Sequence, residues 1–211
     1  MSALPSPLLI VTDRHLARRP LEDIVREAVI GGARWFWLRD RDLEPTERQA
    51  LAFRLAEIVR PAGGRLSIGA DVELAADVGT GAVHVRDVAD IARAREMLGP
   101  TALIGLSAHS LADVANAQRA GTDYVTFSPI YETVSKPGYG PALGTSAIAQ
   151  AAQIGIPIVA LGGIDAGNAA AVLAAGASGI AVMGGIMRAE NPQRTTETLF
   201  TALRSKHMIH S

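Results

Sequence analysis

The sequence contains no cysteine, and only 4% of its residues are aromatic. Without thiols the chain can form no disulfide and offers no thiolate ligand to a metal ion. No apolar stretch approaches the length of about 18 residues that a membrane-spanning helix needs. The N-terminal segment, MSALPSP, lacks the basic region and apolar core of a secretory signal. We therefore expect a soluble, cytoplasmic protein with no membrane partner.

Neither sign of charge is in excess. The chain has 20 lysines and arginines against 21 aspartates and glutamates, a net charge of −1, and no long run of like charges. Nucleic-acid-binding domains usually carry a basic patch or stripe, so we expect no nucleic-acid partner. Hydrophobic residues make up 48% of the chain, which is ample for a core and argues against intrinsic disorder.

Short apolar runs alternate with longer amphipathic segments along the whole chain. The pattern predicts strands at 8–12, 35–38, 65–68, 82–85, 103–106, 124–127, 156–161 and 179–182. It predicts helices at 20–30, 45–60, 71–78, 88–98, 110–120, 145–153, 166–175 and 193–204. Near-continuous apolar strands are typical of a parallel sheet covered by helices. Eight such units of about 25 residues match a (β/α)8 TIM barrel.

We predict a single TIM-barrel domain over residues 1–211. The alternative is an open, doubly wound parallel sheet. No G-x-G-x-x-G motif follows the first predicted strand, which disfavours the dinucleotide-binding form of that fold.

In a TIM barrel the functional residues lie at the C-terminal ends of the strands. Gly162-Gly163 follows the seventh predicted strand, and Gly184-Gly185 follows the eighth. Phosphate sites in these barrels are built from the loops after strands seven and eight, where glycines let backbone N–H groups approach the oxygens. A glycine pair can also simply form a tight turn. Two pairs, one at each of these strand ends, favour a ligand that carries a phosphate.

Two arginines follow the second predicted strand. Arg39 and Arg41 could together bind a second anion such as a diphosphate. The alternative is a solvated cluster in which Asp40 and Asp42 neutralise both arginines.

Two histidines lie at or near strand ends. His109 follows the fifth predicted strand and could transfer protons near neutral pH. It could equally begin the next helix, with Ser110 as the N-cap. His84 lies within the fourth strand, where we expect a packed, hydrogen-bonded core histidine.

The predicted strand that begins at Tyr124 is followed by a loop of about sixteen residues, a length that is uncommon in compact domains and usually functional or disordered. Thr133, Ser135 and Lys136 place two hydroxyls and an ammonium group within this loop. Such a set suits an anionic or phosphorylated ligand. The alternative is a solvated surface loop.

Over nearly its whole length the sequence resembles the thiamine phosphate synthase and TenI family of barrels. The resemblance is carried by LLIVTDR, WLRDRD, IGLSAHS, DYVTFSPIYETVSK, IPIVALGGI and GIAVMGGI. It implies a thiazole phosphate ligand. By position, it assigns Thr133, Ser135 and Lys136 to the thiazole, Gly163, Met183 and Gly184 to its phosphate, and Ser107 and Arg39 to the pyrimidine diphosphate of the synthases.

The sequence departs from the synthase pattern at the metal site. Gly69-Ala70 stands where synthases carry the Asn-Asp pair that places Mg²⁺, and Ala89 stands about where a further aspartate is expected. If the chain is a synthase, the neighbouring Asp71, Asp87 and Asp90 are the candidate Mg²⁺ ligands. Because Mg²⁺ demands near-ideal octahedral oxygen geometry, we expect the displaced carboxylates to bind Mg²⁺ more weakly than those of the synthases.

Two further departures lie at the second strand. Arg41 replaces the synthases' lysine, keeping the charge but not the compact ammonium group. Trp37 replaces a glutamine and could fill space that the pyrimidine needs.

These departures favour the TenI branch, which includes thiazole tautomerases that move a proton without a metal or other cofactor. The RDRD segment resembles the RER of that branch. Its catalytic histidine, however, corresponds to Pro129 here, so we take His109 as the first candidate acid/base and Glu132 as the second. A TenI-like tautomerase acting on thiazole carboxylate phosphate is thus the main expectation.

Two alternatives remain open. One is a Mg²⁺-dependent thiamine phosphate synthase, which couples hydroxymethylpyrimidine diphosphate with thiazole phosphate and releases pyrophosphate. The other is a non-catalytic regulator that binds thiazole or thiamine phosphate, favoured by Pro129. Apolar residues such as Trp35 or Met187 could serve a homo-oligomer interface.

Overall fold

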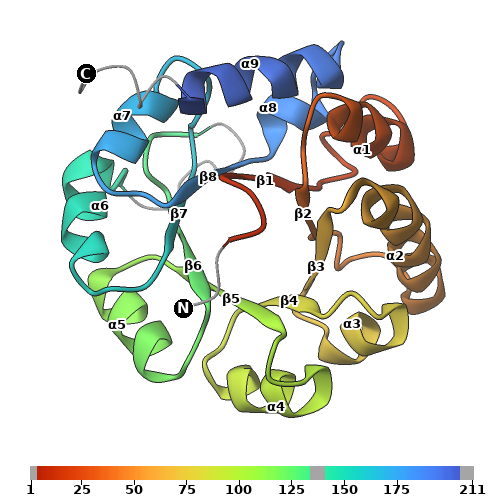
Figure 1. Ribbon diagram of the computed structural model, residues 1–211, viewed down its shortest axis with the longest axis horizontal. Helices are drawn as coiled ribbons and strands as arrows, with labels where there is room; N and C mark the ends of the chain where they lie inside the picture. Colours follow the sequence, from red (N-terminus) through yellow and green to blue (C-terminus); the bar gives the residue numbers. More distant parts are fainter. Residues whose placement is uncertain (1–3, 134–140, 205–211) are drawn as a thin grey trace.

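Eight parallel strands close into a barrel in the computed structural model, which describes residues 4–133 and 141–204 (Figure 1). Each strand pairs with the next along the chain, and the eighth pairs with the first. The strands are β1 (Leu8–Val11), β2 (Trp35–Leu38), β3 (Arg65–Gly69), β4 (Ala82–Val85), β5 (Leu103–Ala108), β6 (Tyr124–Phe127), β7 (Ile158–Leu161) and β8 (Gly179–Val182). The predicted (β/α)8 barrel is confirmed, and the open-sheet alternative is wrong.

The helices form a ring around this barrel (Figure 1). They are α1 (Leu21–Ile30), α2 (Pro45–Val59), η1 (Arg60–Ala62), α3 (Val72–Val78), α4 (Ala89–Leu98), α5 (Leu111–Arg119), α6 (Gly144–Ala152), α7 (Ala169–Ala174), α8 (Gly184–Met187) and α9 (Pro192–Arg204). Among the described residues, none of the helices is both long enough and apolar enough to cross a membrane.

Several boundaries differ from the prediction by one to three residues. β7 begins at Ile158 rather than at 156, because Pro157 has no N–H to donate to a neighbouring strand. α7 begins at Ala169 rather than at 166, because the Asp165 carboxylate accepts from the N–H groups of Gly167 and Asn168 and holds a turn there. The short helix α8 was not predicted, since its two glycines favour a turn over a helix.

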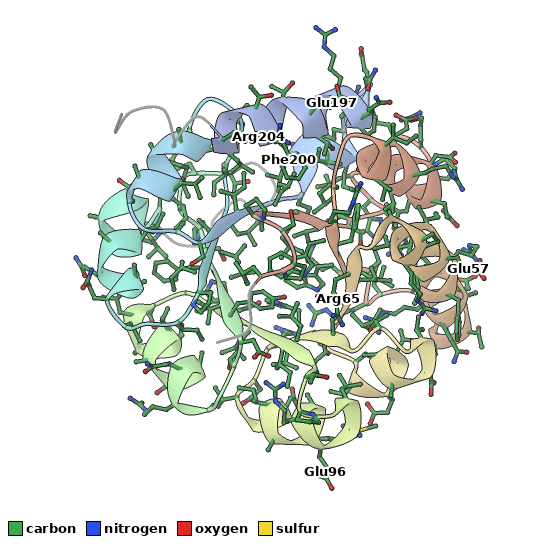
Figure 2. All side chains as sticks on the ribbon, viewed as in Figure 1. Glu57, Arg65, Glu96, Glu197, Phe200 and Arg204 are labelled. Carbon is green, nitrogen blue, oxygen red and sulfur yellow. The ribbon has the colours of Figure 1, made fainter. Side chains whose placement is uncertain are left out.

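Two apolar layers surround the strands. The larger layer lies between the barrel and the helices, and the smaller one fills the barrel interior. Inside the barrel, Trp35 packs edge-to-face on Tyr124 with ring centroids 4.8 Å apart. Trp35 and Met187 are fully buried within the chain, so the suggestion that they serve an interface is wrong. Figure 2 shows side chains filling the ring, while the labelled Glu57 and Glu96 point outward.

The two described ends of the long loop are tied together at its base. The N–H of Leu143 donates to the carbonyl of Pro129 (2.9 Å), and that of Gly144 donates to Ile130 (3.0 Å). Ile130 also donates to Leu161, at the end of β7 (3.0 Å). The first part of the loop is therefore fixed against the C-terminal edge of the barrel.

Candidate functional site

A cavity of about 600 Å³ lies at the C-terminal edge of the barrel. Its volume is within the usual range for small-molecule sites. The predicted catalytic and substrate-binding residues that the structure describes all line it: Arg39, Arg41, Ser107, His109, Glu132, Thr133, Gly163, Met183 and Gly184. Ser135 and Lys136 lie outside the described residues. Side chains from separate strand ends thus lie together around one cavity.

One end of the cavity is formed by the loops after β7 and β8. Gly162 and Gly163 adopt left-handed backbone conformations (φ +103° and +64°). A Cβ at Gly163 would lie 2.5 Å from the carbonyl oxygen of Glu132, so glycine is needed for the long loop to approach β7. The glycine pair therefore shapes the loop as well as the predicted phosphate site.

Arg188 adds a positive charge at this end. Its guanidinium lies against the backbone of Gly184, since a Cβ there would be 2.5 Å from Nη2 and 2.6 Å from Nη1. Nearby, the first N–H groups of α8 have no acceptor within their own helix. Guanidinium and backbone N–H groups together suit a phosphate. Arg188 was not predicted as a site residue, because it follows α8 and does not lie at a strand end.

Three more arginines line the cavity, from the loops after β2 and β4. Arg39 forms an ion pair with Asp13 (2.9 Å), and its Nη1 lies 3.3 Å from the sulfur of Met183. Arg41 and Arg86 line the cavity beside it. Partial burial lowers the pKa of Arg41, as do the charges of Arg86, Arg39 and Arg48. Arg86 was not predicted as a site residue, although it directly follows β4.

The alternative, in which Asp40 and Asp42 neutralise Arg39 and Arg41, is wrong. Asp40 accepts hydrogen bonds from the Thr12 hydroxyl and from the backbone N–H of Arg14, both at 2.6 Å. Asp42 pairs with Arg14 (2.5 Å) and His15 (2.7 Å), and these hydrogen bonds hold the pKa of its carboxyl well below the usual range. Both carboxylates are thus engaged by the loop after β1.

The floor of the cavity is an aromatic pair. The rings of Trp37 and His84 pack with centroids 3.9 Å apart. His84 is fully buried and lies within hydrogen-bond distance of the hydroxyls of Tyr124 (3.0 Å), Ser107 (3.1 Å) and Thr126 (3.2 Å). Burial lowers the pKa of His84 to about 3, so its ring is neutral near pH 7. The predicted hydrogen-bonded core histidine is confirmed, and it lines the cavity too.

His109 both precedes a helix and lines the cavity. Ser110 caps α5 by accepting from the N–H of Asp113, as one of the two alternatives predicted. The Nδ1 of His109 lies 2.8 Å from the carbonyl oxygen of Ser128. Because a carbonyl only accepts, Nδ1 carries the hydrogen, and Nε2 is the basic nitrogen of the neutral ring. The geometry is compatible with a general base.

Two of the three candidate magnesium ligands bind other parts of the chain, and the third lies in a helix. Asp71 caps α3 by accepting from Leu74 (2.9 Å) and forms an ion pair with the buried Arg48 (2.6 Å). Asp87 accepts from the N–H of Ala89 (2.9 Å), and Asp90 lies in the first turn of α4. None of the three is among the described residues that line the cavity.

The residues at the expected metal position do not fit Mg²⁺. Gly69 and Ala70 line the cavity there and supply no side-chain oxygen. Within the part of the chain that the structure describes, no group of three or more histidines, aspartates or glutamates is placed to hold a metal ion.

Comparison with known proteins gives a consistent result. A family model described as thiamine monophosphate synthase matches residues 8–186. A thiamine-phosphate synthase of Azorhizobium caulinodans is 39% identical over 201 residues, which cover 94% of this chain and 95% of that protein. One from Geobacillus thermodenitrificans is 38% identical over 198 residues, covering 91% and 89%.

A solved structure of similar fold points to the same family. A thiamine phosphate pyrophosphorylase from Pyrococcus furiosus superposes with a TM-score of 0.83 at 28% identity, covering 94% of this chain and 96% of that one. Since the family match spans most of the barrel and the relatives are similar over nearly their full length, the chain belongs to the thiamine monophosphate synthase family.

Proposed function

We propose that the protein is a transferase that joins hydroxymethylpyrimidine diphosphate to thiazole phosphate, forming thiamine phosphate and releasing pyrophosphate. One observation carries the proposal: the cavity is lined by arginines from two regions, Arg188 after β8 and Arg39, Arg41 and Arg86 after β2 and β4. The names of relatives 34–39% identical support this reaction over the isomerisation that the sequence first suggested.

The thiazole phosphate occupies the end formed by β7 and β8. Its phosphate lies against the backbone of Gly163, Met183 and Gly184, with the guanidinium of Arg188 as counter-charge. Thr133 is at the beginning of the loop assigned to the thiazole ring. The diphosphate of the second substrate lies near Arg39, Arg41 and Arg86. Its pyrimidine ring lies over Trp37 and beside Ser107, both of which line the cavity.

The reaction exchanges one bond for another. The bond from the pyrimidine methylene carbon to the diphosphate oxygen breaks, and its electron pair leaves with pyrophosphate. The lone pair of the thiazole nitrogen forms the new carbon–nitrogen bond. No proton must move in this step, so positioning and stabilisation of the leaving group are the main demands on the protein. The arginines at the β2 and β4 end meet the second demand.

A coupling assay tests the proposal. Purified protein is incubated with both substrates, and thiamine phosphate is measured by conversion to the fluorescent thiochrome. Arg39→Ala should lower the rate by about ten- to a hundredfold, because it removes a charge-assisted contact with the diphosphate. The matched control is Arg119→Ala, an exposed arginine on α5. The absence of thiamine phosphate under all conditions would contradict the proposal.

The position of His109 favours a second candidate, the isomerisation of thiazole carboxylate phosphate. Its basic Nε2 could remove a proton from the ring carbon and return it elsewhere, with Glu132 as a second acid/base on the cavity wall. His109→Gln should then abolish isomerisation and leave coupling intact. Saturable binding of thiazole phosphate without turnover in either assay would identify a non-catalytic binding protein.

A further inference from the structure

Where the loops after β2, β3 and β4 line the cavity, their residues, all of which the structure describes, contribute arginines and no carboxylate. The two strands flank β3, so the loops that carry Arg41 and Arg86 lie on either side of Gly69 and Ala70. Within residues 4–133 and 141–204, the side chains of Arg41 and Arg86 make no ion pair. Each guanidinium thus retains donors for a ligand in the cavity.

The nearby carboxylates are directed elsewhere. Asp40 and Asp42, on either side of Arg41, pair with the loop after β1. Asp71, which follows Ala70, is held by Arg48 and the first turn of α3. Asp87, which follows Arg86, accepts from the backbone of α4. The positive charge at this part of the cavity is therefore not balanced by its sequence neighbours.

Trp37 and Gly69 fit each other. A Cβ at position 69 would lie 2.8 Å from the indole Nε1 of Trp37 and 2.8 Å from the carbonyl oxygen of Leu38. A larger side chain at 69 therefore requires Trp37 to move. With Trp37 in this position, the backbone at 69 therefore leaves no room for the asparagine of the synthase pattern.

Position 70 shows that the loss of the aspartate is a change of side chain and not of backbone. Ala70 has a left-handed conformation (φ +53°), and its N–H donates to the carbonyl of His84 (2.8 Å). Among non-glycine residues, asparagine and aspartate adopt this conformation most readily. The backbone thus suits a carboxylate, yet the side chain between the two arginines is a methyl group.

We infer that Arg41 and Arg86 bind the diphosphate directly, in place of a divalent metal ion, so that this protein takes a metal-free organic diphosphate. Guanidinium groups match phosphate oxygens with paired, charge-assisted hydrogen bonds. Two fixed positive charges also repel a divalent cation from the same place. The inference rests on the proposed function, because it states how the diphosphate of the second substrate is held.

Calorimetric titration with inorganic pyrophosphate, in excess EDTA, tests the inference without requiring turnover. We expect saturable binding that replacing EDTA by Mg²⁺ does not tighten. Arg41→Ala and Arg86→Ala should each weaken the affinity by about ten- to a hundredfold. Arg86→Lys keeps the charge but loses the planar guanidinium group, so its affinity for pyrophosphate should lie between those of the wild type and Arg86→Ala. Arg119→Ala should bind like the wild type.

Ala70→Asp is a sharper test, since it places a carboxylate between the two arginines on a backbone that suits it. It should weaken pyrophosphate binding in EDTA by at least tenfold, because it neutralises the site. Ala70→Asn, which is nearly the same shape but uncharged, is the matched control and should retain most of the affinity. Thermal unfolding followed by circular dichroism confirms that each variant is folded.

The inference is overturned if wild-type binding requires Mg²⁺, if both arginine variants bind like the wild type, or if Ala70→Asp has no effect. Its failure is distinguishable from that of the proposed function. Thiamine phosphate formed only with Mg²⁺ would keep the reaction and reject the metal-free site. Pyrophosphate binding in EDTA without thiamine phosphate formation would keep the anion site and reject the reaction.

Discussion

At the scale of single residues, the barrel interior depends on a glycine that the sequence did not single out. A Cβ at Gly105 of β5 would overlap the phenol of Tyr124 and the imidazole of His84. Both rings are fully buried and within hydrogen-bond distance of each other. Glycine at 105 therefore makes room for the pair that supports the cavity floor.

Gly105→Ala should lower the free energy of unfolding by about 1–3 kcal/mol or more, because neither buried ring can move aside without disturbing the floor. Urea denaturation followed by circular dichroism measures the change. Gly167→Ala is the control, since Gly167 is exposed and its backbone φ is not positive. Equal stability of the two variants would show that the interior can repack around an added methyl group.

His84 should make the free energy of unfolding fall as the pH is lowered. Burial lowers its pKa in the folded state from an ordinary value near 6.5 to about 3. Between these values the unfolded chain binds a proton that the folded chain does not, so the stability contributed above pH 6.5 is lost as the pH falls toward 3. One such group contributes a slope of up to about 1.4 kcal/mol per pH unit.

His84→Gln should remove the contribution of this histidine to the pH dependence of the free energy of unfolding. Free energies of unfolding measured from pH 7 down to pH 4.5 should therefore fall less steeply in the variant than in the wild type. The carboxylates titrate in both proteins, so the difference between the slopes isolates the histidine. Identical slopes would show that the unfolded and folded chains protonate His84 equally.

At the scale of elements, one ion pair joins α2 to the turn between β3 and α3. Arg48 is buried, and it donates to the carbonyl of Gly69 (2.6 Å) as well as pairing with Asp71. Asp71→Asn should retain the helix cap, since asparagine caps as well as aspartate. It removes the charge opposite a buried guanidinium, at a cost of about 1–3 kcal/mol, because Asp71 is itself partly exposed.

Thermal unfolding and the coupling assay together check this assignment. We expect Asp71→Asn to be less stable, yet to couple the two substrates at nearly the wild-type rate when folded. Asp71→Ala loses both cap and charge and should be less stable still. A wild-type melting temperature combined with lost activity would instead identify Asp71 as a ligand at the active site.

The succession of strands and helices was largely predictable, because buried parallel strands and amphipathic helices leave clear periodic patterns. The cavity residues at strand ends could be found by the same rule, as Arg39 and Gly163 show. Arg188 could not, since only the fold of α8 returns it to Gly184. Nor could the sequence show that Asp40 and Asp42 face Arg14, because that pairing joins two loops far apart in the chain.

At the scale of the whole molecule, a nearly neutral chain concentrates positive charge at one edge. The net charge is only −1, yet the cavity is lined by four arginines against Glu132 and Asp165. A cavity with low-dielectric walls and one sign of charge focuses its field and draws in ligands of the opposite sign. Binding of a multiply charged anion should then depend on ionic strength, although the net charge would not suggest it.

Raising the salt concentration from about 0.01 M to about 0.15 M shortens the screening length from about 30 Å to about 8 Å. We therefore expect pyrophosphate affinity, measured by calorimetry in EDTA, to fall with added salt. The fall should be shallower in Arg86→Ala, which removes one of the charges that make the field. Arg119→Ala, whose arginine is exposed on α5 away from the cavity, should follow the wild type. A salt dependence that is the same in all three proteins would mean that the overall charge, and not the arginines around the cavity, attracts the ligand.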